Sequence, residues 1–113
     1  MRVLIGAIAA AAVVSLALSP ASAQSFSCME LETKGAAEVR VCQSRSLGAL
    51  DEHLDSWYRR ALERAGYFDQ TAEVRGEQRA WLATRNACGA SFWCLRRAYV
   101  TRIRELRNYV EHV

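Results

Sequence analysis

The four cysteines are the residues whose type and spacing offer the most chemistry. They have 13, 45 and 5 residues between successive members and lie at Cys28, Cys42, Cys88 and Cys94. A thiolate can bind a metal or attack a substrate, whereas two thiols can form a structural disulfide. Zinc sites usually contain closely paired ligands such as C-x2-C, which this spacing does not offer. The two histidines, His53 and His112, lie apart from the cysteines, so we expect no metal site and predict both on helix surfaces.

The N-terminal segment indicates which compartment these thiols meet. A basic residue at position 2 precedes an apolar run over residues 3–18, and Pro20 ends that run. The small residues Ala21-Ser22-Ala23 then form the pattern of a cleavage site. Because the run is shorter than the ~20 residues of a spanning helix, we expect a cleaved signal peptide over residues 1–23 in preference to an uncleaved anchor. Cys28 lies beyond Pro20, so a lipoprotein signal is not expected.

The mature chain, residues 24–113, is then one small exported domain, of a size at which covalent links matter. An even number of cysteines in an oxidising compartment predicts two disulfides and leaves no thiol as a nucleophile. Of the three possible pairings we favour the two local ones, Cys28–Cys42 and Cys88–Cys94. Gly89 can end one helix and Ser91 can begin the next, so the second disulfide would close a corner between helices.

Carboxylates at helical spacing offer a second kind of chemistry. Asp51 and Asp55 lie four residues apart with Glu52 beside them, and two carboxylates can act as acid and base on a glycosidic bond. That reaction requires the two groups to have different environments, which nothing in the sequence indicates. There is also no phosphate-binding loop and no nucleophile–base set, so we expect neither enzyme activity nor a cofactor.

Polar residues on the apolar stripes are expected to hold helices in register. Arg79 and Arg85 lie on or beside such a stripe, and we expect Asp51 to pair with one of them across two helices. Gln78 is expected to form a hydrogen bond in the same region.

Apolar residues recur at three- and four-residue steps through the mature chain, as they do in amphipathic helices. A short helix over residues 35–44 would come first. The second would begin after an N-cap at Ser46 and would end at Gly66 in the C′ position.

The third helix would open at Asp69 or Thr71 and would end at residues 88–89, and the fourth would run from Phe92 to Val110. Short connections are typical of antiparallel neighbours. The predicted fold is therefore all-α, a small disulfide-stapled antiparallel bundle of three to four helices. Four large side chains are expected to anchor its core: Trp57, Tyr58, Trp81 and Tyr99.

Charge is distributed unevenly along the mature chain. Residues 24–70 carry 6 basic and 8 acidic side chains, whereas residues 71–113 carry 8 basic and 4 acidic ones. The mature net charge of +2 (14 basic against 12 acidic residues) is too small to indicate nucleic acid or a membrane as a partner.

The helical pattern also carries a family resemblance. The segments "QRAWLATRNAC" and "CLRRAYVTRIREL", preceded by Leu50-Asp51, Leu54, Tyr58 and Leu62, resemble the lysozyme inhibitor LprI family in its N-terminal domain form, from about Cys28 to Leu106. The resemblance implies an exported bacterial protein, periplasmic or secreted, that binds lysozyme or another envelope protein. It assigns no inhibitory residue, and this chain lacks the lipobox of the lipoprotein after which the family is named. The motif residues, which we expect to shape the domain, are Asp51, Tyr58, Gln78, Arg79, Trp81, Arg85 and Tyr99.

Two functions are consistent with this pattern. An inhibitor of a basic lysozyme would present carboxylates to its target, and the acidic half supplies Glu30, Glu32, Glu38, Asp51, Glu52 and Asp55. The alternative is a non-enzymatic envelope binding or structural module that holds an anionic partner with Arg75, Arg79, Arg96, Arg97, Arg104 and Arg107.

Overall fold

Four α-helices make up most of the part of the chain that the structure describes. The computed structural model describes residues 26–112, and the predicted signal peptide, residues 1–23, lies outside them. A short 3-10 helix, η2 (Leu31–Thr33), is followed by α1 (Ala36–Gln43), α2 (Arg45–Tyr67), α3 (Thr71–Ala87) and α4 (Phe92–Glu111). No strand occurs in the described range, and the predicted all-α class is confirmed.

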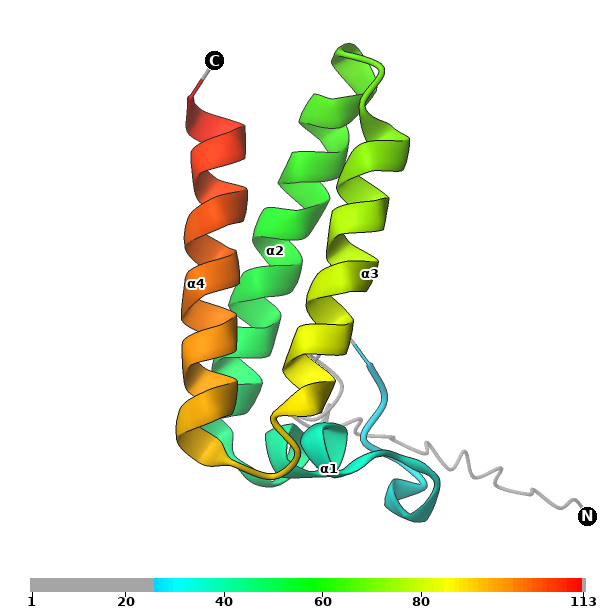
Figure 1. The fold of residues 1–113 in the computed structure, drawn as a ribbon, viewed down its shortest axis with the longest axis vertical. Coiled ribbons are helices and arrows are strands. Elements are labelled where there is room, and N and C mark those ends of the chain that lie inside the picture. The colour runs from blue at the N-terminus through cyan, green and yellow to red at the C-terminus, as the bar shows by residue number, and fades with distance from the viewer. Residues whose placement is uncertain (1–25, 113) are drawn as a thin grey trace, which may run out of the picture.

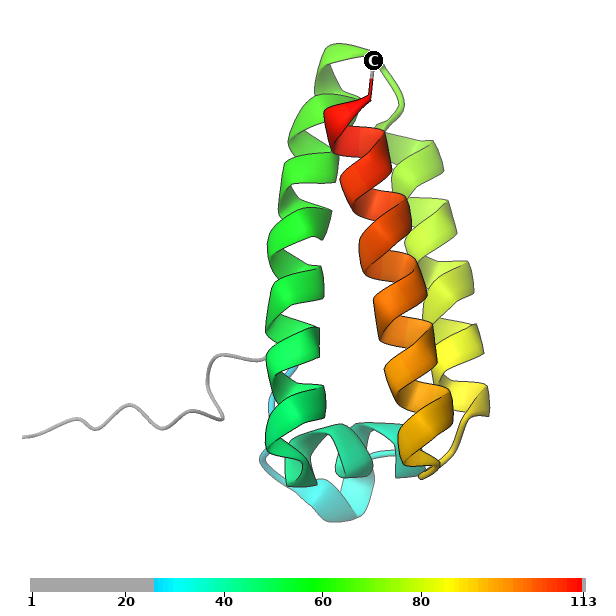
Figure 2. The same ribbon diagram turned by 90° about the vertical axis from the view of Figure 1, so that its left-hand side faces the viewer.

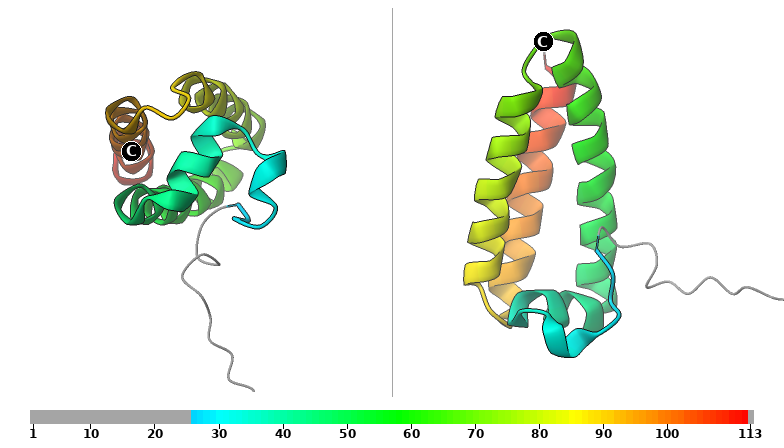
Figure 3. Two further views of the ribbon diagram at one scale, coloured as in Figure 1. Left: turned by 90° about the horizontal axis from the view of Figure 1, so that it is seen from below. Right: turned by 90° about the vertical axis from the view of Figure 1, so that its right-hand side faces the viewer.

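The three long helices run alongside one another. Successive helices α2, α3 and α4 alternate in direction, so α2 and α4 point the same way (Figures 1 and 2). The short helix α1 crosses the lower end of this bundle, where the α3–α4 connection also lies (Figure 3). The α2–α3 turn and the end of α4 form the opposite end (Figure 1). The bundle therefore has one end covered by α1 and one end formed by a bare turn.

The start of α2 differs from the prediction. Ser44, not Ser46, is the N-cap, and its side chain accepts a hydrogen bond from the Leu47 amide at 3.1 Å. Ser44 has extended backbone between two helices, which a capping residue requires, whereas Ser46 already lies inside the helix. One residue therefore connects α1 to α2, which is why α1 packs closely on the lower end.

The end of α2 also differs from the prediction. Gly66 is helical, and the left-handed residue of the turn is Asp69, with φ of 57°. The amide of Gln70 donates back to the Ala65 carbonyl at 2.8 Å and closes the turn. Aspartate tolerates this conformation better than most residues, so no glycine is needed there. The third helix then begins at Thr71, one of the two predicted residues.

The corner between α3 and α4 matches the prediction. Gly89 is left-handed with φ of 59°, and the Ser91 side chain accepts a hydrogen bond from the Cys94 amide at 3.4 Å. The disulfides pair Cys28 with Cys42 and Cys88 with Cys94, as predicted. Together they include all four cysteines of the chain.

Two of the four expected anchors fill the core. Trp81 and Tyr99 are buried, and their rings meet edge to face at 5.1 Å. Trp57 and Tyr58 are only half-buried and pack against the edge of the core. Aliphatic residues from all four helices complete it, among them Val41, Leu47, Leu54, Val74, Leu95, Ile103 and Leu106.

Candidate functional site

A buried polar cluster links the three long helices in their lower half. The hydroxyl of Tyr99 on α4 donates to Oδ1 of Asp51 on α2 at 2.8 Å. Nη1 of Arg85 on α3 donates to the same hydroxyl at 3.3 Å. Asp51 and Arg85 are only 1% and 3% exposed. The expected partner of Asp51 was Arg79 or Arg85, and the structure places the Tyr99 hydroxyl between Asp51 and Arg85.

The surroundings of Tyr99 favour its neutral form. Burial raises the pKa of the Tyr99 hydroxyl far above its ordinary value, and the nearby Asp51 carboxylate raises it further. Arg85 opposes this effect only in part. Tyr99 therefore stays protonated and serves as a fixed donor to Asp51.

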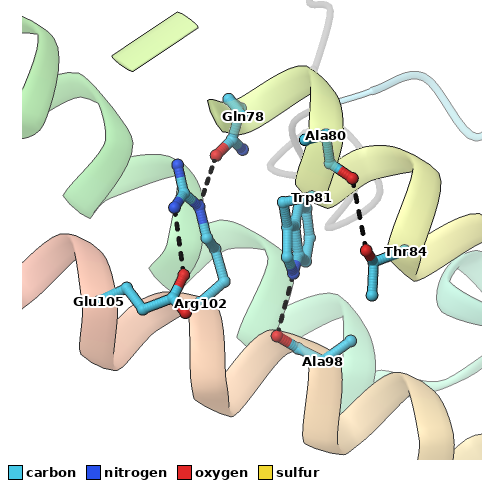
Figure 4. A network of polar contacts seen from close by, with 7 residues as sticks. All are labelled: Gln78, Ala80, Trp81, Thr84, Ala98, Arg102 and Glu105. Atoms are coloured by element: carbon cyan, nitrogen blue, oxygen red, sulfur yellow. Dashed lines mark hydrogen bonds and ion pairs between the residues drawn. The ribbon is translucent and has the colours of Figure 1, made fainter. Parts of the chain in front are cut away.

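A second polar network lies further up the bundle, between α3 and α4 (Figure 4). Nε of Arg102 donates to Oε1 of Gln78 at 2.9 Å, and Nη1 donates to Oε1 of Glu105 at 3.2 Å. The indole N–H of Trp81 donates to the carbonyl of Ala98 at 3.1 Å. Gln78 thus bonds to Arg102, a residue of the predicted fourth helix to which the sequence assigned no partner.

The remaining motif residues line a groove between α2 and α3. Tyr58 and Leu54 line it from α2, and the exposed Arg79 lines it from α3. Asp55 is at its edge and forms an ion pair with exposed Arg59 at 2.6 Å. These residues form no set that could act as nucleophile and base.

The described residues contain neither a candidate metal site nor a candidate membrane-spanning helix. In residues 26–112, no three side chains of histidine, cysteine, aspartate or glutamate gather closely enough to hold a metal ion. None of the helices found there is long and apolar enough to cross a membrane. His53 is exposed on α2, as predicted, and accepts a hydrogen bond from the indole of Trp57 at 3.1 Å. His112 is also exposed, but it follows the last residue of α4 with extended backbone, so its predicted place on a helix is wrong.

The α2–α3 turn, which we call the tip (residues 67–73), presents exposed aromatic and acidic side chains together. Tyr67 is 80% exposed and Phe68 is 53% exposed. Asp69 and Glu73 are exposed beside them, and no basic residue occurs between positions 65 and 74. Adjacent exposed aromatics of this kind are typical of a binding surface.

The base of the tip is held in place by contacts to neighbouring residues. The hydroxyl of Tyr109 donates to Oε1 of Gln70 at 2.6 Å and ties the turn to the end of α4. The guanidinium of Arg64 lies over the rings of Phe68, at 4.9 Å, and of Tyr109, at 5.5 Å. The exposed side chains of the tip therefore stand on an ordered base.

The solvent side of α4 is basic. Arg96, Arg97, Arg104 and Arg107 are all exposed, and at 3.6 residues per turn they fall within about 100° of the helix circumference. Trp93, which is 70% exposed, lies at the N-terminal end of the same side. We call these five residues the α4 basic face. Arg75 and Arg79 are also exposed, but they lie on α3.

Comparison with known proteins identifies the family. Residues 28–106 match the family described as lysozyme inhibitor LprI. The chain belongs to the LprI family. The matched range begins at the first disulfide cysteine and includes α1, α2, α3 and most of α4. No curated protein and no solved structure matches the chain. The LprI family and the two disulfides point to an extracytoplasmic protein.

Sequence reasoning missed two features of this LprI domain. It treated Asp69 only as a candidate helix start, although Tyr67-Phe68-Asp69 places two aromatics beside a carboxylate between two helices. It assigned no partner to Arg102, a charged residue within the predicted fourth helix. It also assigned Asp51 to the acidic surface of an inhibitor, which is wrong because Asp51 is buried.

Proposed function

We propose that this protein binds lysozyme in the periplasm or outside the cell and inhibits it by placing the tip in the substrate cleft. Membership of the LprI family supports lysozyme as the partner. The observation that carries the proposal is the tip itself, where Tyr67 and Phe68 are exposed beside Asp69. The proposed inhibition involves no chemical step, since the inhibitor only excludes the substrate.

Shape supports this mode of binding. A glycosidase that cleaves a polysaccharide binds it between two carboxylates in a concave site. The tip is a narrow convex end of a helical bundle, beside the C-terminal end of α4 (Figure 2). Because Gln70 is bonded to Tyr109, the turn needs little further ordering when it binds.

Chemistry supports the same mode. Exposed tyrosine and phenylalanine side chains supply large contact area at low conformational cost, and tyrosine is enriched among residues that dominate binding energy. Asp69 and Glu73 are the charged residues of the tip itself, and their carboxylates can pair with cations of a basic enzyme, although Arg64 lies over Phe68 at the base. The tip is therefore complementary to a positively charged protein with a concave site.

A peptidoglycan-lysis assay with the purified, oxidised protein tests the proposal against c-type and other lysozymes. The wild type is expected to inhibit at least one lysozyme, and Tyr67→Ala/Phe68→Ala is expected to weaken inhibition at least about tenfold, equivalent to about 1.4 kcal/mol. Asp69→Asn keeps a residue that tolerates the left-handed conformation and should weaken inhibition of a basic lysozyme. Trp93→Ala removes an equally exposed aromatic at the opposite end and is expected to inhibit like the wild type.

The outcomes separate two parts of the proposal. No inhibition at a large molar excess over every lysozyme tested would reject the inhibitor function. Inhibition that survives the changes at Tyr67 and Phe68 would reject the tip as the contact surface, while leaving lysozyme as the partner.

The α4 basic face supports a second candidate function, an envelope module for an anionic partner. Four exposed arginines on one helix side create a positive field, and Trp93 adds an apolar contact at its end. Arg104→Gln/Arg107→Gln should then weaken binding to anionic vesicles or to an anionic cell-wall polymer, and added salt should weaken it further. Equal binding by wild type and variant would reject this function.

A further inference from the structure

A groove of about 820 Å³ runs between α3 and α4. Its volume lies within the range of small-molecule sites in proteins. Ala80, Thr84 and Ala87 line it from α3, opposite Ala98 and Thr101 of α4. These short side chains leave space between the two helices, and Trp81, Val74 and Leu106 make much of the remaining lining apolar.

One charged side chain in this lining is almost completely buried. Arg102 is 6% exposed, and two of its three guanidinium nitrogens are bonded, Nε to Gln78 and Nη1 to Glu105. Nη2 is buried and has no hydrogen-bond partner among the described residues. A buried donor of a charged group is costly to leave unpaired, so an acceptor that reached Nη2 would be favoured.

The charges of the groove indicate what that acceptor is. Arg97 and Arg102 line it together with Glu77 and Glu105, so its formal charge is zero. Moving Glu105 away from Arg102 would leave one surplus positive charge, which suits a single carboxylate and not a dianion. A guanidinium fork matches a planar carboxylate in geometry. The apolar lining matches an apolar chain attached to that carboxylate.

We propose that the α3–α4 groove binds an amphiphile that carries one carboxylate and an apolar chain. The carboxylate takes the place of Glu105 on Nη1 of Arg102 and reaches the buried Nη2 once Glu105 has moved aside, and the chain lies along the alanines and Trp81. Glu105, whose side chain is 57% exposed, is bonded to Nη1 in this structure and turns into solvent when the ligand binds. Glu105 is therefore a built-in competitor of the ligand, and this site is separate from the tip.

Decanoate, with decanol as the matched uncharged ligand, is the probe that tests this site. The background is Trp57→Phe/Trp93→Phe, so that fluorescence comes from Trp81 in the groove, with calorimetry on the wild type as a second readout. Decanoate is expected to saturate one site per chain and to bind at least about tenfold more tightly than decanol. Failure of decanoate to bind, or equal affinities for the two ligands, would overturn the proposal.

Two exposed glutamates provide a matched pair of variants. Glu105→Gln frees Nη1 of Arg102 and is expected to tighten decanoate binding about threefold to tenfold, leaving decanol binding unchanged. Glu77→Gln removes the same charge from the same groove without freeing an Arg102 nitrogen, and is expected to change affinity by less than about twofold. Equal effects of the two variants would show general electrostatics and reject the assigned role of Arg102.

Removing the guanidinium is the direct test. Arg102→Gln is expected to reduce decanoate affinity to that of decanol. If this variant does not fold, the comparison of Glu105→Gln with Glu77→Gln decides the question alone, because both positions are exposed.

Discussion

Replacing Tyr99 by phenylalanine removes one atom from the centre of the buried cluster. The hydroxyl donates to Asp51 at 2.8 Å and accepts from Arg85 at 3.3 Å. Each hydrogen bond to a charged group contributes about 1.5–3 kcal/mol, and the variant also leaves buried charged groups without that partner. Because Asp51 and Arg85 attract each other across the vacated space and recover part of the loss, we expect Tyr99→Phe to lower the free energy of unfolding by about 2–3 kcal/mol.

Urea unfolding of the oxidised protein, followed by circular dichroism and tryptophan fluorescence, measures this change. The control is Tyr67→Phe, which removes the same atom from an exposed tyrosine and is expected to change stability by less than about 0.5 kcal/mol. In a double-mutant cycle, Tyr99→Phe with Asp51→Asn should show coupling of at least about 1 kcal/mol. A change below about 0.5 kcal/mol for Tyr99→Phe, with an unchanged dependence on urea, would refute the assignment of the hydroxyl as a stabilising bridge.

Three further predictions concern stability. Cys28→Ala/Cys42→Ala should lower the free energy of unfolding by about 3 kcal/mol in urea unfolding, since the disulfide closes a loop of about 15 residues. Reduced wild type, which also loses Cys88–Cys94, should be less stable than the oxidised variant. Because the pKa of Tyr99 is raised in the folded state, the folded protein binds more protons than the unfolded chain above about pH 10. The contribution of this group to the free energy of unfolding should therefore be constant below that pH and fall above it. This fall should disappear in Tyr99→Phe. Gly89→Ala should lower the free energy of unfolding by about 1–2 kcal/mol because φ is positive at this residue. Gly66 lies in helical backbone, so Gly66→Ala should raise the free energy of unfolding by up to about 1 kcal/mol. The thermal unfolding midpoint should therefore fall in the first variant and rise in the second.

The fold was predictable where only one nearby residue could cap a helix or form the turn. Gly89 and Ser91 lie between two clear apolar stripes, so they predicted the α3–α4 corner and the disulfide across it. Near α2 the signals competed, because both Ser44 and Ser46 can cap a helix. Only the position of α1 on the bundle decides which serine has extended backbone.

The buried network was predictable in its members but not in its connections. Asp51, Gln78 and Arg85 lie on apolar stripes, so their burial follows from helical periodicity. Which groups meet depends on the rotation and separation of three helices, and the sequence of one helix does not contain these quantities. Tyr99 was expected only as an apolar anchor, although its hydroxyl is the atom that joins Asp51 to Arg85.

The tip was missed for a different reason. Aromatic residues usually indicate burial, so Tyr67 and Phe68 offered no sign that they stay exposed. Their exposure follows from their place at the very end of α2, where no fourth long helix covers the bundle (Figure 1). From one sequence alone, the exposure of Tyr67 and Phe68 can be inferred only from the order of the helices along the chain.

The two ends of the bundle differ in what holds them together. The lower end has both disulfides, α1 and the Asp51–Tyr99–Arg85 cluster, so covalent and buried polar links fix it against opening. The opposite end depends on the Tyr109–Gln70 hydrogen bond and on Arg64 over aromatic rings, which order the turn without a covalent link. A small protein that binds through its tip needs this division, because one end preserves the fold while the other presents ordered, exposed side chains to its partner. The stability of the domain and its proposed binding are therefore assigned to opposite ends of the same three helices, and substitutions at one end should leave the other property largely intact.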